Sequence, residues 1–128
     1  MVILYDRFNL PDNIYEVIFS TRQQRIVAKL LINEMKKHGG EMTKPQMSLF
    51  ATQLHEGEYI ATLDEPPYKG KKVKISYNKR QFYDRILTPL KGMGCIEYNL
   101  YKKTYKISDA FNKDMIKIGL MWLREMRK

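Results

Sequence analysis

Between residues 76 and 108 the sequence changes from a helical apolar repeat to a strand-like alternation, and two glycines separate the two patterns. Asn78 with Gln81 matches a helix-capping box, and helical spacing then places five apolar residues on one face. These inward-facing residues are Phe82, Ile86 and Leu90, flanked by Tyr83 and Leu87. Pro89 lacks a backbone N–H and is expected to kink or tighten the last turn. Apolar and polar residues then alternate on both sides of the turn 101–104, so a β-hairpin is predicted after the helix.

Two more helices are predicted upstream, each with a capping box at its start and glycine at its end. Ser20 with Gln23 marks the start of the first helix, which runs to a pair of glycines. Thr43 with Gln46 marks the start of the second, and Pro45 falls in its first turn, where a missing N–H does no harm. Apolar residues follow both starts at helical spacing, so each helix has one face for a core.

The flanking segments complete a single predicted domain of 128 residues. Residues 1–19 are expected to form an N-terminal arm, with an extended stretch over 1–11 and a short helix capped by Asp12. Residues 58–75 contain two β-like stretches around a Pro-Pro and Gly centre, which indicates a hairpin or an ordered loop. The fold is therefore expected to be α+β and mainly α, with a final helix over 109–128.

The final helix has two apolar stripes, although one would suffice to dock it on a small domain. The first stripe, expected to pack on the protein's own core, consists of Phe111, Met115, Ile118, Trp122 and Met126. The second stripe, predicted to form a homodimer interface, consists of Ile116, Leu120 and Leu123. A dimer is expected because monomers rarely expose large apolar patches. The alternative is a monomer in which both stripes are buried against residues 1–10.

The charge of the chain, +9 in total, is distributed unevenly. Residues 1–68 contain seven Lys or Arg and nine Asp or Glu, whereas residues 69–128 contain sixteen and five. Such a basic region attracts a polyanion or an anionic membrane surface. Apolar runs are too short for a membrane span, and the N-terminal residues lack the features of a signal peptide. A single cysteine excludes an internal disulfide, and a cytoplasmic protein is expected.

An enzyme is not expected from this sequence. It contains no glycine-rich phosphate loop, no metal-ligand cluster with usable spacing and no Ser/His/Asp arrangement. Cys95 stands where a strand begins, and it is predicted to be a buried apolar residue rather than a nucleophile. Neither a cofactor nor a metal is expected.

Residues 84–108, DRILTPLKGMGCIEYNLYKKTYKIS, resemble the winged helix-turn-helix pattern. In that pattern a recognition helix ends in Leu-x-x-Leu, passes a glycine and enters the wing with an apolar residue. The matching positions are Leu87, Leu90, Gly94 and Ile96. The order of elements over residues 20–108 is similar to that of small PadR-like and MarR-like regulators. The resemblance implies a winged helix-turn-helix with a C-terminal dimerisation helix, and a transcription regulator that binds double-stranded DNA sequence-specifically.

One feature departs from the resembled families. About twenty residues separate Leu54 from Asn78, where those families have a short turn. The insertion 58–75 is either an extra hairpin on the DNA side of the domain or the sign of a different docking mode.

The amino end of the third helix is predicted to enter the major groove, where base edges present distinguishable donors and acceptors. The residues predicted to contact bases are Asn78, Lys79, Arg80, Gln81 and, one turn on, Arg85. Lys102 and Lys103 at the hairpin turn are predicted to reach the flanking DNA backbone, and Lys71 and Lys72 are also predicted to bind DNA.

Each of these predictions has a simpler alternative. Asn78 and Gln81 can serve only as helix caps, the wing can be an ordinary solvated turn, and the lysines of 69–74 can protect a strand edge. Other classes of function are a protein–protein adaptor with an acidic partner, a replication or segregation protein, and a single-stranded nucleic-acid binder. The last would stack bases on Tyr98 or Tyr101.

Overall fold

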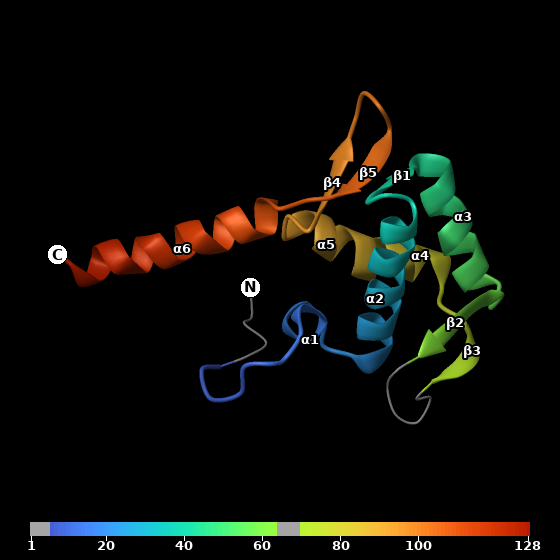
Figure 1. Cartoon of the computed structure of the whole chain (residues 1–128), viewed down its shortest axis with the longest axis horizontal. Helices are drawn as coiled ribbons and strands as arrows, with labels where there is room; N and C mark the ends of the chain where they lie inside the picture. The colour runs from blue at the N-terminus through green and yellow to red at the C-terminus, as the bar shows by residue number, and fades with distance from the viewer. Residues whose placement is uncertain (1–5, 64–69) are drawn as a thin grey trace.

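The computed structural model describes residues 6–63 and 70–128 (Figure 1). The fold is α+β and mainly helical, with a small antiparallel sheet, as the sequence predicted. The helices are α1 (Ile14–Ile18), α2 (Arg22–Lys37), α3 (Lys44–His55), α4 (Lys79–Gln81), α5 (Thr88–Gly92) and α6 (Ala110–Met126). A π-helical segment, Phe82–Leu87, joins α4 to α5, and the three together are called helix 79–92 below. The strands are β1 (Glu41–Thr43), β2 (Tyr59–Leu63), β3 (Lys71–Ile75), β4 (Ile96–Asn99) and β5 (Thr104–Ile107).

The core lies between α2, α3 and helix 79–92, each of which buries the apolar face that its sequence predicted. Leu31 of α2, Phe50 of α3 and Phe82 of the π-helical segment are at most 2% exposed. The rings of Phe50 and Phe82 have centroids 5.5 Å apart. A three-stranded sheet in the order β1-β5-β4 adds the buried side chains of Met42 and Ile96. Full burial of such a side chain stabilises the fold by about 1.5–3 kcal/mol.

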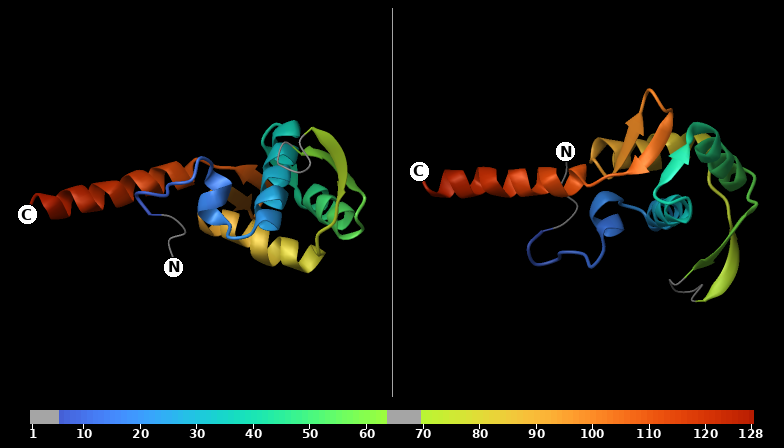
Figure 2. Two further views of the ribbon diagram at one scale, coloured as in Figure 1. Left: turned by 90° about the horizontal axis from the view of Figure 1, so that it is seen from below. Right: turned by 45° about the horizontal axis from the view of Figure 1, so that its top comes forward.

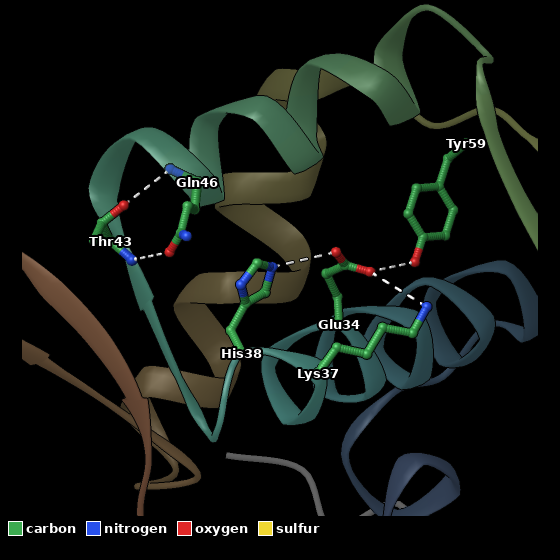
Figure 3. A network of polar contacts seen from close by, with 6 residues as sticks. All are labelled: Glu34, Lys37, His38, Thr43, Gln46 and Tyr59. Atoms are coloured by element: carbon green, nitrogen blue, oxygen red, sulfur yellow. Dashed lines mark hydrogen bonds and ion pairs between the residues drawn. The ribbon is translucent and has the colours of Figure 1, made fainter.

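Helix caps explain where the first helices begin, with two corrections to the predicted positions. The capping box of α2 is Thr21 with Gln24, one residue later than predicted. Arg25 favours this register because its guanidinium donates to the Ser20 carbonyl at 3.3 Å, which holds that residue outside the helix. The helix α1 is capped by Asn13 rather than by Asp12. The capping box of α3 is Thr43 with Gln46, as predicted (Figure 3).

The N-terminal arm contains a local turn where an extended stretch was predicted. Residues 1–5 of that stretch lie outside the described residues. In the remainder, the carboxylate of Asp6 accepts the backbone N–H groups of Phe8 and Asn9 at 2.8 and 2.9 Å. This Asx-type turn satisfies the backbone locally, which removes the groups that a strand would need.

The insertion 58–75 forms an antiparallel hairpin of β2 and β3, of which residues 64–69 are outside the described part. Its Tyr59 hydroxyl donates to Glu34 of α2 at 2.8 Å (Figure 3). After β3 the chain returns to the end of α3, where the Tyr77 N–H donates to the Leu54 carbonyl at 2.8 Å. The insertion therefore leaves the end of α3 next to the start of α4, despite the intervening residues.

The final helix α6 extends away from the rest of the molecule along most of its length (Figure 1). Gly94 lies against its first turn, where the Phe111 N–H donates to the Gly94 carbonyl at 3.1 Å. Residues 112–128 are all exposed. Apart from Phe111, which is half-buried, both apolar stripes are therefore uncovered, so the prediction that the first stripe packs on the protein's own core is wrong. So is the alternative that both stripes are buried within one chain.

Candidate nucleic-acid interface

Helix 79–92 has an exposed polar face opposite its core face. The core face is as predicted, with Phe82, Ile86, Leu87 and Leu90 buried and Tyr83 half-buried. Among the residues predicted to contact bases, those on the exposed face are Asn78, Arg80, Gln81 and Arg85. The structure thus gathers four of the five predicted residues on one accessible surface and leaves Lys79 apart.

The start of this helix is fixed by a cap and by the preceding residue. The Asn78 side-chain oxygen accepts the Gln81 N–H at 3.1 Å. This is the only half of the predicted capping box that forms among the described residues. Tyr77, just before the cap, is buried in the core. The capping role of Asn78 uses one lone pair of its oxygen and leaves its side-chain amide N–H groups available to a ligand.

Lys79 connects helix 79–92 to α3. Its ammonium donates to the hydroxyls of Ser48 and Thr52 at 3.3 and 2.9 Å. Its backbone N–H donates to the Nδ1 atom of His55 at 3.1 Å. These contacts hold the side chain against α3 and half-bury it. Lys79 therefore positions the start of the helix, whereas the sequence predicted a base contact.

Arg80 and Asp84 form an ion pair on the exposed face, with 3.8 Å between Nε and the carboxylate oxygen. The Arg80 side chain is 92% exposed, so the attraction is screened by water and weak. Asp84 nevertheless lowers the positive charge of this face. A carboxylate here repels phosphate but can accept a hydrogen bond from a cytosine amino group.

The middle of helix 79–92 is wider than an α-helix, and this wide turn directly precedes the last turn, where Pro89 was predicted to cause a kink or a tightening. The N–H of Thr88 donates to the Tyr83 carbonyl five residues before it, and its hydroxyl donates to the same oxygen at 2.8 Å. An α-helical proline ring clashes with the carbonyl four residues earlier, here that of Arg85. The wider turn relieves this clash, and Thr88 supplies a second hydrogen bond at the same place.

The β4–β5 hairpin has the form that the sequence predicted, with its turn exposed. The Asn99 side-chain oxygen accepts the N–H groups of Tyr101 and Lys102 at 2.9 and 3.0 Å. Lys103 adopts a positive φ of 54°, which few residues other than glycine take. Tyr101 is 98% exposed. Tyr98, in contrast, is half-buried and lies against the ring of Tyr105 with centroids 4.7 Å apart.

Lys44, at the first position of α3, lies beside this turn and was not predicted as a site residue. Its N–H donates to the Lys103 carbonyl at 3.0 Å, and strand β1 pairs Thr43 with Thr104 of β5. Lys44, Lys102 and Lys103 are all exposed. The sequence does not predict this proximity, because three residues are too few to identify β1 as a strand.

The insertion lysines lie apart from the hairpin turn. In Figure 1 the β4–β5 turn lies at the top of the view and strands β2 and β3 lie at the lower right, and the right-hand view in Figure 2 also separates them. Lys71 and Lys72 are adjacent in β3 and therefore face opposite sides of its sheet. The structure does not bring them together with Lys102 and Lys103, and their predicted role in DNA binding stays a prediction.

The described residues offer little for other chemistry. They contain no group of three His, Cys, Asp or Glu side chains that could hold a metal ion. Burial raises the pKa of the half-buried Cys95 thiol, which keeps it protonated and weakens it as a nucleophile. Within the same part of the chain, no helix is long and apolar enough to cross a membrane.

Comparison of the chain with protein-family models, curated proteins and solved structures finds no match.

Proposed function

We propose that the protein is a winged helix-turn-helix that binds double-stranded DNA, with helix 79–92 in the major groove. The observation that carries this proposal is the helix with Arg80, Gln81 and Arg85 on its accessible face and its opposite face fixed in the core. A major groove admits one α-helix, and arginine and glutamine match guanine and adenine edges there. The role implied for such a protein is sequence-specific regulation of transcription.

The order of the elements supports the same proposal. The helices α2 and α3 are followed by helix 79–92 and the β4–β5 hairpin, and β1 between α2 and α3 pairs with β5. This pairing holds the hairpin turn next to Lys44 at the start of α3. In the proposed complex, Lys44, Lys102 and Lys103 contact phosphates beside the groove that helix 79–92 occupies.

The contact between α3 and α4 supports a helix-turn-helix arrangement in spite of the insertion. The Tyr77 N–H on the Leu54 carbonyl and the Lys79 ammonium on Thr52 keep the two helices adjacent. The β2–β3 hairpin is then an addition between two helices that still contact each other.

Fluorescence anisotropy with a labelled duplex, obtained by selection of random sequences for binding, tests this proposal. The decisive variant is Arg80→Gln with Arg85→Gln, which removes two charges from helix 79–92. Its matched control is Lys113→Gln with Lys117→Gln, which removes two charges from the exposed surface of α6. For a site with six to ten phosphate contacts, affinity is expected to fall about 10³–10⁵-fold between 50 and 200 mM salt.

The proposal requires weaker binding by the Arg80 and Arg85 variant than by its control, together with the steep salt dependence. If both variants lost the same affinity, binding would depend on the total positive charge of the protein and not on the position of the charges. That result would contradict a defined interface. The absence of duplex binding at low salt would overturn the proposal and favour a protein partner with an acidic surface.

A further inference from the structure

The exposed helix α6 contains a glycine surrounded by large apolar side chains. On a helix surface, the neighbours of any residue are those one, three and four positions away in both directions. For Gly119 these six neighbours are Met115, Ile116, Ile118, Leu120, Trp122 and Leu123. They belong to both apolar stripes, and Gly119 lies between the stripes. The two stripes are therefore the walls of one shallow depression centred on Gly119.

The chain itself does not explain why this position is a glycine. A Cβ atom added at Gly119 would meet nothing within 4 Å, and the backbone there is helical. In a helix interior, glycine is less stable than alanine by about 0.5–1 kcal/mol. A missing side chain at the centre of an exposed apolar surface is useful only if another backbone or side chain approaches there.

The size of this surface matches what a stable interface needs. The six neighbours of Gly119 are 36–66% exposed, and Met126 is 62% exposed. Together these seven side chains expose on the order of 800 Å², which is the area that each partner contributes to a standard protein interface. The charged side chains of Lys113, Lys117 and Arg124 lie on the opposite side of the helix at 100° per residue.

We propose that α6 binds α6 of a second copy of this chain, with the two helices crossing at Gly119. The surface suits its own copy because apolar residues occupy the positions one, three and four away on both sides of the glycine. In a two-fold dimer both subunits contribute the same surface. Because the apolar positions are arranged alike on either side of Gly119, two antiparallel copies of the helix would each meet apolar residues on both sides of the crossing. The absence of charge from the surface also matches an identical apolar surface rather than a polar ligand.

This inference enlarges the predicted interface. The sequence assigned only Ile116, Leu120 and Leu123 to the dimer, whereas the crossing at Gly119 uses both stripes. The inference is independent of DNA binding, because none of the residues in helix 79–92 or the β4–β5 turn takes part in it.

Analytical ultracentrifugation of the full chain tests the inference with two variants. Gly119→Leu fills the depression, and the open space around Gly119 shows that the single chain can accommodate the new side chain. Lys117→Leu is the matched control, with the same new side chain on the charged side of α6. Circular dichroism and melting temperature verify that both variants keep the wild-type fold.

The wild type is expected to sediment as a dimer, and Gly119→Leu is expected to raise the dimer dissociation constant by at least about ten-fold. Lys117→Leu is expected to leave it unchanged. A wild-type monomer at concentrations up to roughly 100 µM would overturn the inference. A Gly119→Leu variant that dimerises as tightly as the wild type would do the same, because the crossing point would then lie elsewhere.

Discussion

The Lys79 ammonium lies 2.9 Å from the hydroxyl of Thr52, so one lysine of the predicted DNA-binding set joins α4 to α3 instead. A second hydroxyl, that of Ser48, accepts from the same ammonium. This connection acts together with the Asn78 cap and the bond from the Lys79 N–H to His55 to set the orientation of Arg80 and Gln81 relative to the rest of the fold.

Replacement of Lys79 by Met should affect stability more than DNA binding. Loss of the hydrogen bonds to α3 is expected to lower the free energy of unfolding by about 1 kcal/mol. The matched variant Arg80→Met should leave stability within about 0.5 kcal/mol and weaken binding to a selected duplex by about 1–3 kcal/mol. Urea denaturation and fluorescence anisotropy measure the two effects. An equal loss of affinity in both variants would show that Lys79 also contacts DNA.

Base contacts and backbone contacts should separate in a comparison of preferred and random duplexes. Arg80→Ala and Arg85→Ala are each expected to lose about 1–3 kcal/mol at a selected duplex and much less at a random one. Lys102→Ala and Lys103→Ala should weaken both duplexes about equally, because phosphates are present in every sequence. Parallel behaviour of the two pairs of variants would contradict the division between a base-reading helix and a backbone-contacting turn.

Local patterns predicted the elements of this fold well because their signals lie in contiguous residues. The apolar spacing of Phe82, Ile86 and Leu90 identified the core face of helix 79–92, and the alternation around residues 101–104 identified the hairpin. The capping box of α2 was misplaced by one residue because Ser20 and Thr21 each have a glutamine three positions later. Both boxes match the capping pattern equally well, so the sequence cannot show which one forms. In the structure, the contact of Arg25 with the Ser20 carbonyl favours the box that begins at Thr21.

Features of the candidate interface that depend on distant residues were beyond the sequence. The position of Lys44 beside the β4–β5 turn results from a three-residue strand that pairs across about sixty positions. The restraint on Lys79 comes from the hydroxyls of Ser48 and Thr52 on α3. Serine and threonine on a helix surface do not by themselves indicate which distant residue they bind. The exposure of the first apolar stripe of α6 was also missed, because an apolar stripe predicts burial without identifying the molecule that buries it.

The register of the α2 cap leads to a simple prediction. Thr21→Ala removes the oxygen that accepts the Gln24 N–H at 3.1 Å, so the free energy of unfolding should fall by about 1 kcal/mol. Ser20→Ala should change it by less than about 0.5 kcal/mol, because Ser20 lies outside the helix and is exposed. Thermal or urea denaturation of the two variants makes the comparison. If Ser20→Ala lowered the free energy of unfolding more than Thr21→Ala, the cap would be Ser20, as the sequence predicted.

Tyr59→Phe should loosen the attachment of the β2–β3 hairpin to α2. The lost hydrogen bond to Glu34 is expected to lower the free energy of unfolding by about 1–2 kcal/mol at pH 7. Tyr101→Phe is the control, because its ring is 98% exposed and no change is expected. An effect of Tyr59→Phe no larger than that of the control would show that the hairpin is held by its apolar contacts alone.

The same pair should respond to alkaline pH in a defined direction. Burial, together with the hydrogen bond and the charge of Glu34, raises the pKa of Tyr59 above its usual value. The folded state therefore holds the Tyr59 proton more tightly than the unfolded chain, and the stability from this group is complete below pH about 10 and lost above it. The stability advantage of the wild type over Tyr59→Phe should thus shrink as the pH rises past about 10 in urea denaturation. An advantage that stays constant to higher pH would contradict the raised pKa and, with it, the contact between Tyr59 and Glu34.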